Sequence, residues 1–265
     1  MKIGFIGTGN MGGILAQAVA GSTMQPTVFL ADRDREKAGA LAEKIGAQVV
    51  DNKRLAEHCD VLFLGVKPQV LPAVAAELKP VLQARNDRFL LVTMAAGVST
   101  EQLSRLLDGA YPTVRIMPNT PAAVGKGLIL YTSANGVSET ELSDFTAYMA
   151  PAGSLLPIAE DKIDAAGAVS GCGPAFVYLF LEALADGGVA CGLSRETALA
   201  CAAETVRGAA DMVLQTKQHP AVLKDAVCSP AGTTVAGVEA LEKGKFRATA
   251  FSAVKAAYER TLELK

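Results

Sequence analysis

Six residues near the N-terminus have the spacing of a loop that binds phosphate. The run Gly7-Thr8-Gly9-Asn10-Met11-Gly12 follows an expected strand, Ile3–Ile6, and leads into a helical pattern. A G-x-G-x-x-G run between a strand and a helix is typical of dinucleotide-binding proteins. We expect Gly7 to allow a tight turn, Gly9 to let the backbone approach a pyrophosphate, and Gly12 to let helix and strand pack closely. The positive end of the helix would then face the phosphates.

Charged residues after the second expected strand bear on the choice of dinucleotide. Asp32 lies where a carboxylate accepts a hydrogen bond from the adenosine ribose, which favours NAD. Arg33 follows directly, and a guanidinium there pairs with the 2′-phosphate of NADP. Lys37 adds to the positive side. The two signals oppose each other, and a solvated loop that binds neither explains the same charges. The residues alone therefore leave the choice open.

Two further loops are expected at the same edge of the sheet. Val66 ends the next long apolar run and Lys67 and Pro68 follow it, and Ala95 follows the run after that. In an open α/β sheet, ligands lie outside the carboxyl ends of the strands, so these residues should face the cofactor. Plain connecting loops would have the same composition.

One polar run in the second half of the chain precedes an apolar helical pattern. It reads Ser229-Pro230-Ala231-Gly232-Thr233-Thr234. The successive N–H groups of Gly232, Thr233 and Thr234, with two hydroxyls, make a good receptor for a carboxylate. A simple helix cap that binds nothing explains the residues equally well.

The periodicity of the apolar residues predicts the elements that position these loops. Strands are expected at Lys2–Ile6, Thr27–Ala31, Val61–Val66, Phe89–Thr93, Thr113–Met117, Gly127–Tyr131 and Ser154–Pro157, and helices near 11–20, 34–44, 69–79, 99–107 and 138–149. Strands that alternate with helices indicate parallel β-α units, and hence an α/β, doubly wound Rossmann-type sheet. We place this dinucleotide-binding domain at residues 1–157.

The strand signal ends after residue 157, and residues 158–265 are expected to form an all-α dimerisation and substrate domain. Helices are predicted at Pro174–Ala190, Ser194–Gln215, Thr234–Glu242 and Ala248–Leu264. Small-residue faces on these helices need a partner surface, and a second subunit would supply one.

The overall composition narrows the class of protein. The net charge is −2, from 25 basic and 27 acidic residues, which gives no reason to expect nucleic acid or an anionic membrane as a partner. Five cysteines without a C-x-x-C pair argue against a disulfide framework or a metal site and fit a reducing, cytoplasmic location. The chain opens with a strand pattern and not with a secretory leader, so we expect a soluble protein.

Six motifs together make nearly the whole chain resemble the pyrroline-5-carboxylate reductases. They are G-T-G-N-M-G at 7–12, V-K-P at 66–68, A-A-G at 95–97, M-P-N-T-P at 117–121, S-G-C-G-P-A at 170–175 and H-P-A-V-L-K-D-A-V-C-S-P-A-G-T-T at 219–234. The last is far more specific than the glycine loop. The resemblance implies hydride transfer from NADPH, or from NADH, to the cyclic imine 1-pyrroline-5-carboxylate, which gives L-proline. It also implies a homodimer or a larger assembly of dimers.

The resemblance further implies roles for single residues. Asn52 would contact the adenosine part of the cofactor, and residues 66–68 would flank the nicotinamide. Ser229, Gly232, Thr233 and Thr234 would form the substrate loop, with Thr234 as the catalytic residue that reaches the carboxylate and the ring nitrogen. The family often has Gly-Gly where this chain has Ala231-Gly232. A methyl group at residue 231 is harmless unless that residue needs a positive φ.

The chemistry suits a site that is poor in acids and bases. A protonated cyclic imine accepts hydride without a strong enzymatic acid, so positioning and electrostatics would dominate catalysis. Two alternatives are a related imine or β-hydroxyacid reductase and a dinucleotide-sensing protein without turnover. The hydroxyacid enzymes usually carry a catalytic lysine on the helix that opens the second domain, and Pro174–Ala190 contains none.

Overall fold

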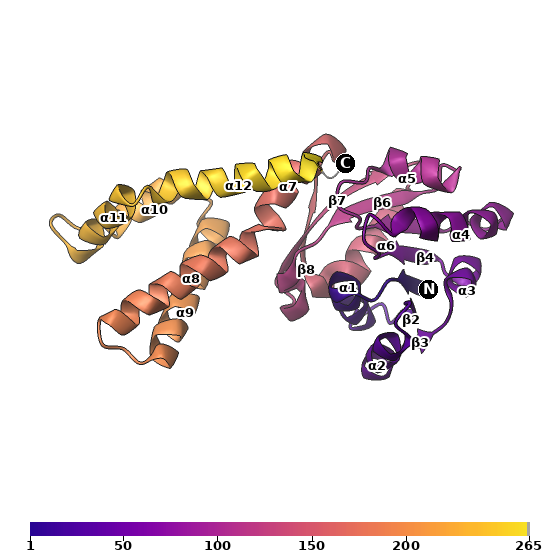
Figure 1. The fold of residues 1–265 in the computed structure, drawn as a ribbon, viewed down its shortest axis with the longest axis horizontal. Helices are drawn as coiled ribbons and strands as arrows, with labels where there is room; N and C mark the ends of the chain where they lie inside the picture. The colour runs from indigo at the N-terminus through magenta and orange to yellow at the C-terminus, as the bar shows by residue number, and fades with distance from the viewer. Residues whose placement is uncertain (264–265) are drawn as a thin grey trace. The chain divides into compact units, whose positions relative to one another are not determined.

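The computed structural model describes residues 1–263, which divide into two compact units (Figure 1). Unit 1 comprises Met1–Cys172 and the chain from Ala257 onward, and unit 2 comprises Gly173–Ala256. Leu264 and Lys265, where the predicted last helix and second domain end, lie outside the described residues. A functional domain boundary at 157/158 stays a prediction; that position is the end of the last strand.

Unit 1 contains a single sheet of eight strands, and each predicted strand has a counterpart in it. The strands are β1 (Lys2–Ile6), β2 (Thr27–Ala31), β3 (Gln48–Val49), β4 (Val61–Leu64), β5 (Leu90–Thr93), β6 (Thr113–Met117), β7 (Gly127–Ala134) and β8 (Gly153–Pro157). The short edge strand β3 was not predicted, because two residues are too few to show a period.

The strand order is β3-β2-β1-β4-β5-β6-β7-β8, so the order reverses between β1 and β4. Neighbouring strands are parallel except for β6 and β7, which pair antiparallel. No helix was predicted between these two strands, but their antiparallel pairing was not anticipated. Only a 3₁₀ turn, η1 (Thr120–Val124), joins the two strands, whereas a parallel crossover needs a dozen or so residues.

Helices cover both faces of the sheet, as a parallel sheet requires. The α-helices of unit 1 are α1 (Asn10–Ala20), α2 (Arg35–Ile45), α3 (Asn52–His58), α4 (Leu71–Ala84), α5 (Thr100–Leu107), α6 (Glu139–Met149) and α7 (Ile163–Ser170), with 3₁₀ turns η2 (Ala150–Ala152) and η3 (Glu160–Lys162). Side chains of α1, α2 and α6 belong to one buried cluster, and those of α3, α4 and α5 belong to the other.

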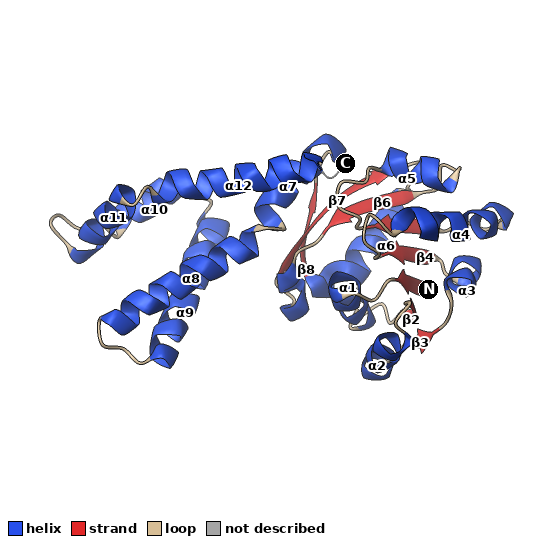
Figure 2. Ribbon diagram, in the orientation of Figure 1, coloured by secondary structure: helices blue, strands red, loops and turns tan. Residues whose placement is uncertain are grey.

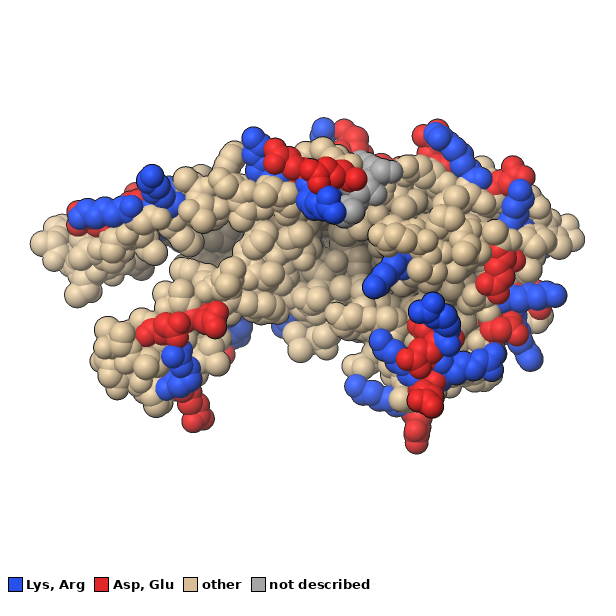
Figure 3. Space-filling view, in the orientation of Figure 1, with Lys and Arg blue, Asp and Glu red and all other residues tan. Residues whose placement is uncertain are grey.

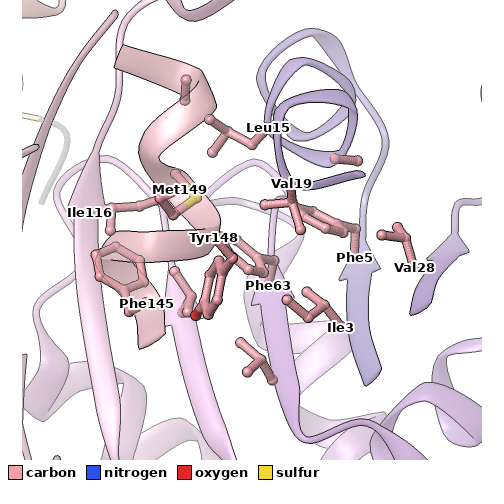
Figure 4. Packing of buried hydrophobic residues seen from close by; sticks show 14 of the residues in the cluster. Ile3, Phe5, Leu15, Val19, Val28, Phe63, Ile116, Phe145, Tyr148 and Met149 are labelled. Carbon is pink, nitrogen blue, oxygen red and sulfur yellow. The ribbon is translucent and has the colours of Figure 1, made fainter. Parts of the chain in front are cut away.

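Alternate residues of the central strands point into these two clusters. Phe5 and Phe63 stack on the α1 side with ring centroids 4.3 Å apart, and Tyr148 from α6 closes over Phe63 (Figure 4). Leu62 and Leu64 face the other helices. Each buried side chain of this size stabilises the fold by roughly 1.5–3 kcal/mol. The sheet is thus a rigid support for the loops at its edges.

Unit 2 is helical throughout its described residues (Figure 2). Its helices are α8 (Gly173–Ala190), α9 (Arg195–Thr216), α10 (Pro220–Ala226), α11 (Thr233–Lys243) and the first part of α12 (Phe246–Glu263). Ser194 caps α9, as its position before the helical pattern suggests, by accepting a hydrogen bond from the Thr197 N–H. The Nδ1 atom of His219 caps α10 in the same way.

The helices α8 and α9 form a hairpin that leaves much apolar surface exposed. Gly192 turns the chain with φ +99, and a Cβ on Gly188 would lie 3.0 Å from the Ala198 methyl group, so glycine lets the two helices approach closely. Tyr178 is 58% exposed and Leu179 is 66% exposed. Figure 3 shows that much of the visible surface of this unit carries no charged side chain.

One helical run within residues 1–263, Glu160–Ala190, has the length and composition of a membrane span. In the structure this run is not one helix, because it is divided among η3, α7 and α8. Its apolar composition equally suits a helix that packs against another subunit.

Candidate active site

The glycine loop connects β1 to α1 at the carboxyl edge of the sheet. Gly7 has φ +93, and a Cβ there would lie 2.8 Å from the backbone of Gly65. A Cβ on Gly12 would lie 2.1 Å from the Gly7 carbonyl oxygen. Both positions therefore need glycine for the fold itself, as a tight turn and close helix packing require.

Gly9 differs, because a Cβ on this residue would meet nothing within 4 Å. It is also the N-cap residue of α1, and no side chain caps that helix. Asn10 and Met11 follow as the first helical residues. The fold does not need glycine at residue 9, but an open backbone at a positive helix end is what a pyrophosphate would need.

Loops from the neighbouring strands lie beside the glycine loop. The Gly7 N–H donates to the Ala31 carbonyl oxygen at 2.8 Å, and the Gly65 N–H donates to the Ile6 carbonyl oxygen at 2.8 Å. A side-chain carbon of Val66 would lie 3.0 Å from a Cβ on Gly7. The ends of β2, β1 and β4 therefore form one continuous rim, at the point where the strand order reverses. Such a point is where open α/β sheets bind ligands.

The predicted rim residues differ in what they can offer a ligand. Lys67 is exposed, and Val66 and Pro68 are half-buried. Ala95 follows β5, but the whole residue is only 2% exposed and packs in the core, so it offers a ligand little surface.

Asp32 is turned toward the glycine loop. Its Oδ2 atom accepts hydrogen bonds from the Thr8 N–H at 2.6 Å and from the Thr8 hydroxyl at 3.0 Å, and its Oδ1 atom accepts from the Asp34 N–H at 2.9 Å. Burial acts to raise the pKa of Asp32, but these hydrogen bonds outweigh it and hold the pKa below its usual value. Arg33 and Lys37 beside it are exposed.

Asn52 is the first residue of α3, and the Asp51 side chain caps that helix. The Asn52 amide donates to the Glu77 carboxylate on α4 at 2.9 Å. This hydrogen bond fixes the orientation of the Asn52 side chain.

The predicted substrate loop precedes α11 in unit 2. The N-cap residue of α11 is Gly232, and no side chain caps the helix. A Ser or Thr cap, the simpler explanation of the motif, is therefore not what the structure shows. Thr233 and Thr234 are exposed and are the first helical residues. An uncapped helix start with two hydroxyls can bind a carboxylate.

A tight turn shapes this loop. The Gly232 N–H donates to the Ser229 carbonyl oxygen at 3.0 Å, and Ala231 has φ +56. A proline followed by a residue with positive φ is the pattern of a type II turn, which favours glycine at that third position. Residue 231 therefore does need a positive φ, and its methyl group is not harmless. A Cβ on Gly232 would lie 2.2 Å from the Ser229 hydroxyl oxygen and 3.1 Å from the Ser229 carbonyl oxygen, so a side chain at residue 232 would force the Ser229 hydroxyl to move.

Two polar clusters of unit 1 were missed at the level of sequence. Arg115 on β6 is 3% exposed at its side chain and contacts Asp164 at 2.5 Å and Glu160 at 3.5 Å. The Asn119 amide donates to the Ser170 carbonyl oxygen at 2.9 Å and accepts from the Leu128 N–H at 2.9 Å. The signal for the first was a charged residue in the apolar strand T-V-R-I-M.

No group of three or more His, Cys, Asp or Glu residues within residues 1–263 is arranged to hold a metal ion. The Cys59 thiol is buried, and burial raises its pKa to about 12, so it is a poor nucleophile.

Comparisons with known proteins agree along the whole chain. Residues 160–264 match the family model described as pyrroline-5-carboxylate reductase dimerisation, and residues 2–97 match the one described as NADP oxidoreductase, coenzyme F420-dependent. A pyrroline-5-carboxylate reductase of Arabidopsis thaliana is 41% identical over 99% of this chain and 95% of its own length.

Further relatives and solved structures point the same way. The pyrroline-5-carboxylate reductase of Synechocystis is 39% identical over 100% of this chain and 98% of its own length. The pyrroline carboxylate reductase of Plasmodium falciparum, solved with NADP bound, has a TM-score of 0.89 at 34% identity and covers 99% of this chain and 97% of its own. With the glycine loop and the uncapped α11 in place, the sequence and the fold lead to one conclusion: the chain belongs to the pyrroline-5-carboxylate reductase family.

Proposed function

We propose that this protein is an oxidoreductase that reduces 1-pyrroline-5-carboxylate to L-proline with NADPH. The observation that carries the proposal is the end-to-end match to reductases of this name, at 41% identity over 99% of the chain for one of them. The glycine loop and the S-P-A-G-T-T loop, which such a reaction needs, both lie within that match.

The glycine loop fits a dinucleotide. The open backbone at Gly9 and the free positive end of α1 would hold the pyrophosphate, with Asn10 and Met11 supplying backbone around it. Thr8 would hold the loop in place through its hydrogen bonds to Asp32. The bound cofactor supplies the hydride. Val66, Lys67 and Pro68, with Ala95 buried behind them, would flank it at the rim, and Asn52 would contact its adenosine part. Arg33 and Lys37 are exposed cations suited to a 2′-phosphate, which favours NADPH over NADH.

The start of α11 would hold the substrate. The N–H groups of Gly232, Thr233 and Thr234 would bind the carboxylate, which the positive helix end stabilises. The Thr234 hydroxyl would donate to the ring nitrogen or to the carboxylate as charge shifts during hydride transfer. Ser229 shapes the loop, because its hydroxyl lies against Gly232. Catalysis by this chain then consists of positioning and electrostatic stabilisation.

The active protein would be a homodimer or a larger assembly of dimers. Residues 160–264 match a dimerisation model, and α8 exposes Tyr178 and Leu179. A Cβ on Gly187 or on Gly208 would meet nothing within 4 Å in the protomer, so a partner helix could approach these positions closely. We further propose a cytoplasmic protein that has neither nucleic acid nor a membrane as partner.

The absorbance of the reduced nicotinamide tests the activity. We expect it to fall with 1-pyrroline-5-carboxylate plus NADPH, and not to rise with 3-hydroxyisobutyrate plus NAD. Turnover of the hydroxyacid alone would instead support the β-hydroxyacid reductase alternative. Tight cofactor binding without turnover of either substrate would support a dinucleotide sensor.

A further inference from the structure

The carboxylate of Asp32 is engaged with its own protein at both oxygens. Three donors reach it: the Thr8 N–H, the Thr8 hydroxyl and the Asp34 N–H, at 2.6, 3.0 and 2.9 Å. Thr8 is 1% exposed, so its N–H lies where water cannot replace the carboxylate as acceptor. Removing Asp32 would therefore leave a buried donor without this acceptor, which is costly.

The position of Thr8 makes this contact important for the phosphate-binding backbone. Thr8 lies between Gly7, which turns the chain with φ +93, and Gly9, whose open side would receive the pyrophosphate. Asp32 follows the end of β2, and the Gly7 N–H already donates to the Ala31 carbonyl oxygen on that strand. The carboxylate thus ties the middle of the glycine loop to the rigid sheet through a second point.

The contact between Asp32 and Thr8 also alters the cofactor preference that an acidic residue at this position would normally indicate. A carboxylate that accepts from the ribose hydroxyl favours NAD and repels the 2′-phosphate of NADP. Here Asp32 points at Thr8, its charge is spread over three donors, and Lys37 adds an attractive charge nearby. An acidic residue so placed is compatible with a phosphate that Arg33 and Lys37 would bind.

We infer that Asp32 is a positioning residue that orders the glycine loop through Thr8, and that it does not select between NADH and NADPH. This inference rests on the proposed function only in assuming that the loop binds a dinucleotide. An ordered loop lowers the entropy lost on binding, and this gain applies equally to both cofactors.

Loop positioning and cofactor selection predict different effects of Asp32 substitutions on the binding of NADH and NADPH. We would titrate Asp32→Ala and Asp32→Asn with NADPH and with NADH, following the fluorescence of the reduced nicotinamide. A positioning role predicts that Asp32→Ala raises both dissociation constants by a similar factor, on the order of tenfold or more. Asp32→Asn keeps one acceptor oxygen and should restore part of the affinity for both. A weaker NADH complex with an unchanged or tighter NADPH complex would overturn the inference, as would unchanged binding of both.

A measurement on the protein without cofactor distinguishes an effect of Asp32 on the order of the glycine loop from a direct contact between Asp32 and the cofactor. Hydrogen exchange at the Thr8 amide should be slow in the wild type and faster in Asp32→Ala. Thr8→Val, which removes one donor to the carboxylate, should weaken both cofactors, and its effect combined with Asp32→Asn should be less than additive. An additive pair with unchanged exchange would contradict the inference.

Asp60→Ala is the matched control. Its Oδ2 atom accepts from the Lys2 N–H at 2.7 Å, which is a carboxylate-to-backbone bond at the opposite end of β1. This variant should leave both dissociation constants near those of the wild type. If the wild type itself binds neither cofactor, the proposed function fails, which is distinct from a selective effect of Asp32.

Discussion

The guanidinium of Arg115 meets the carboxylate of Asp164 inside unit 1, with Nη2 2.5 Å from Oδ1. The two side chains are 3% and 6% exposed. Glu160 lies 3.5 Å from the same guanidinium and also accepts from the N–H and hydroxyl of Thr100 at 2.7 Å each. One charged cluster therefore joins β6, the start of α5, η3 and α7.

Arg115→Met should destabilise the protein by about 3–5 kcal/mol, because it removes the buried positive charge that compensates the buried carboxylate of Asp164 and lies near the half-buried Glu160. Urea unfolding of the apoprotein measures this. The double variant Arg115→Met with Asp164→Leu should recover part of the loss, since it buries no carboxylate at residue 164. A loss within the range of ordinary surface substitutions would show that the cluster is not structurally important.

Ala231→Gly should stabilise the chain by about 0.5–1 kcal/mol. A non-glycine residue at positive φ costs about 1–2 kcal/mol, and the greater freedom of glycine in the unfolded chain offsets part of the gain. Ala236→Gly, in α11, is the control and should have the opposite sign, at about 1 kcal/mol. Equal destabilisation by both variants would mean that residue 231 carries no strain.

Gly9→Ala should fold like the wild type but bind NADPH much more weakly, and Gly9→Val should abolish binding. Their side chains would enter space that is open in the protein and that we assign to the pyrophosphate. Thermal unfolding of the apoprotein and cofactor titration give the two readouts. Gly39→Ala, also at an open position, but within α2, serves as control. Wild-type affinity in Gly9→Ala would place the phosphates elsewhere.

Thr234→Ala should lower kcat/KM for the imine by roughly 10- to 100-fold, as expected for loss of a hydrogen bond to a charged group. The dissociation constant of NADPH should stay nearly unchanged. Thr249→Ala is a suitable control, because its hydroxyl donates to the carbonyl oxygen of Lys245 within the same unit. Full kcat/KM in Thr234→Ala would show that the substrate loop is wrongly assigned.

Glu141 should stabilise the protein at neutral pH and less so in acid. The bidentate hydrogen bonds from Arg88 and those from Ser138 lower its pKa from 4.5 to about 2. A lowered folded-state pKa gives stability that is present above 4.5 and is lost as the pH falls toward 2. The difference in unfolding free energy between the wild type and Glu141→Gln should therefore shrink from pH 7 to pH 3. A constant difference would rule out this linkage.

Sequence reasoning succeeded where the determinants are local. The turn at Gly7 and the close packing at Gly12 follow from six consecutive residues between a strand and a helix, so the motif and its geometry agree. The alternating apolar runs of unit 1 likewise predicted every strand long enough to show a period.

It failed where a property depends on contacts between distant residues. Arg115 and Asp164 are 49 positions apart, and Thr8 and Asp32 are 24 apart, so neither pairing has a local signal. The direction of β7 depends on a short connection that carries no strand or helix pattern. The positive φ of Ala231 was named only as a condition, because alanine is not the residue that such a turn normally selects.

Because α8 exposes apolar side chains to water, the resistance of the protein to unfolding and degradation should depend on its concentration in the cell. If a second copy covers them, the free energy of unfolding grows with the logarithm of protomer concentration. At low expression a larger share of newly made chains would then stay single, with Tyr178 and Leu179 accessible to chaperones and proteases. Halving the number of transcripts would in that case remove more than half of the working molecules.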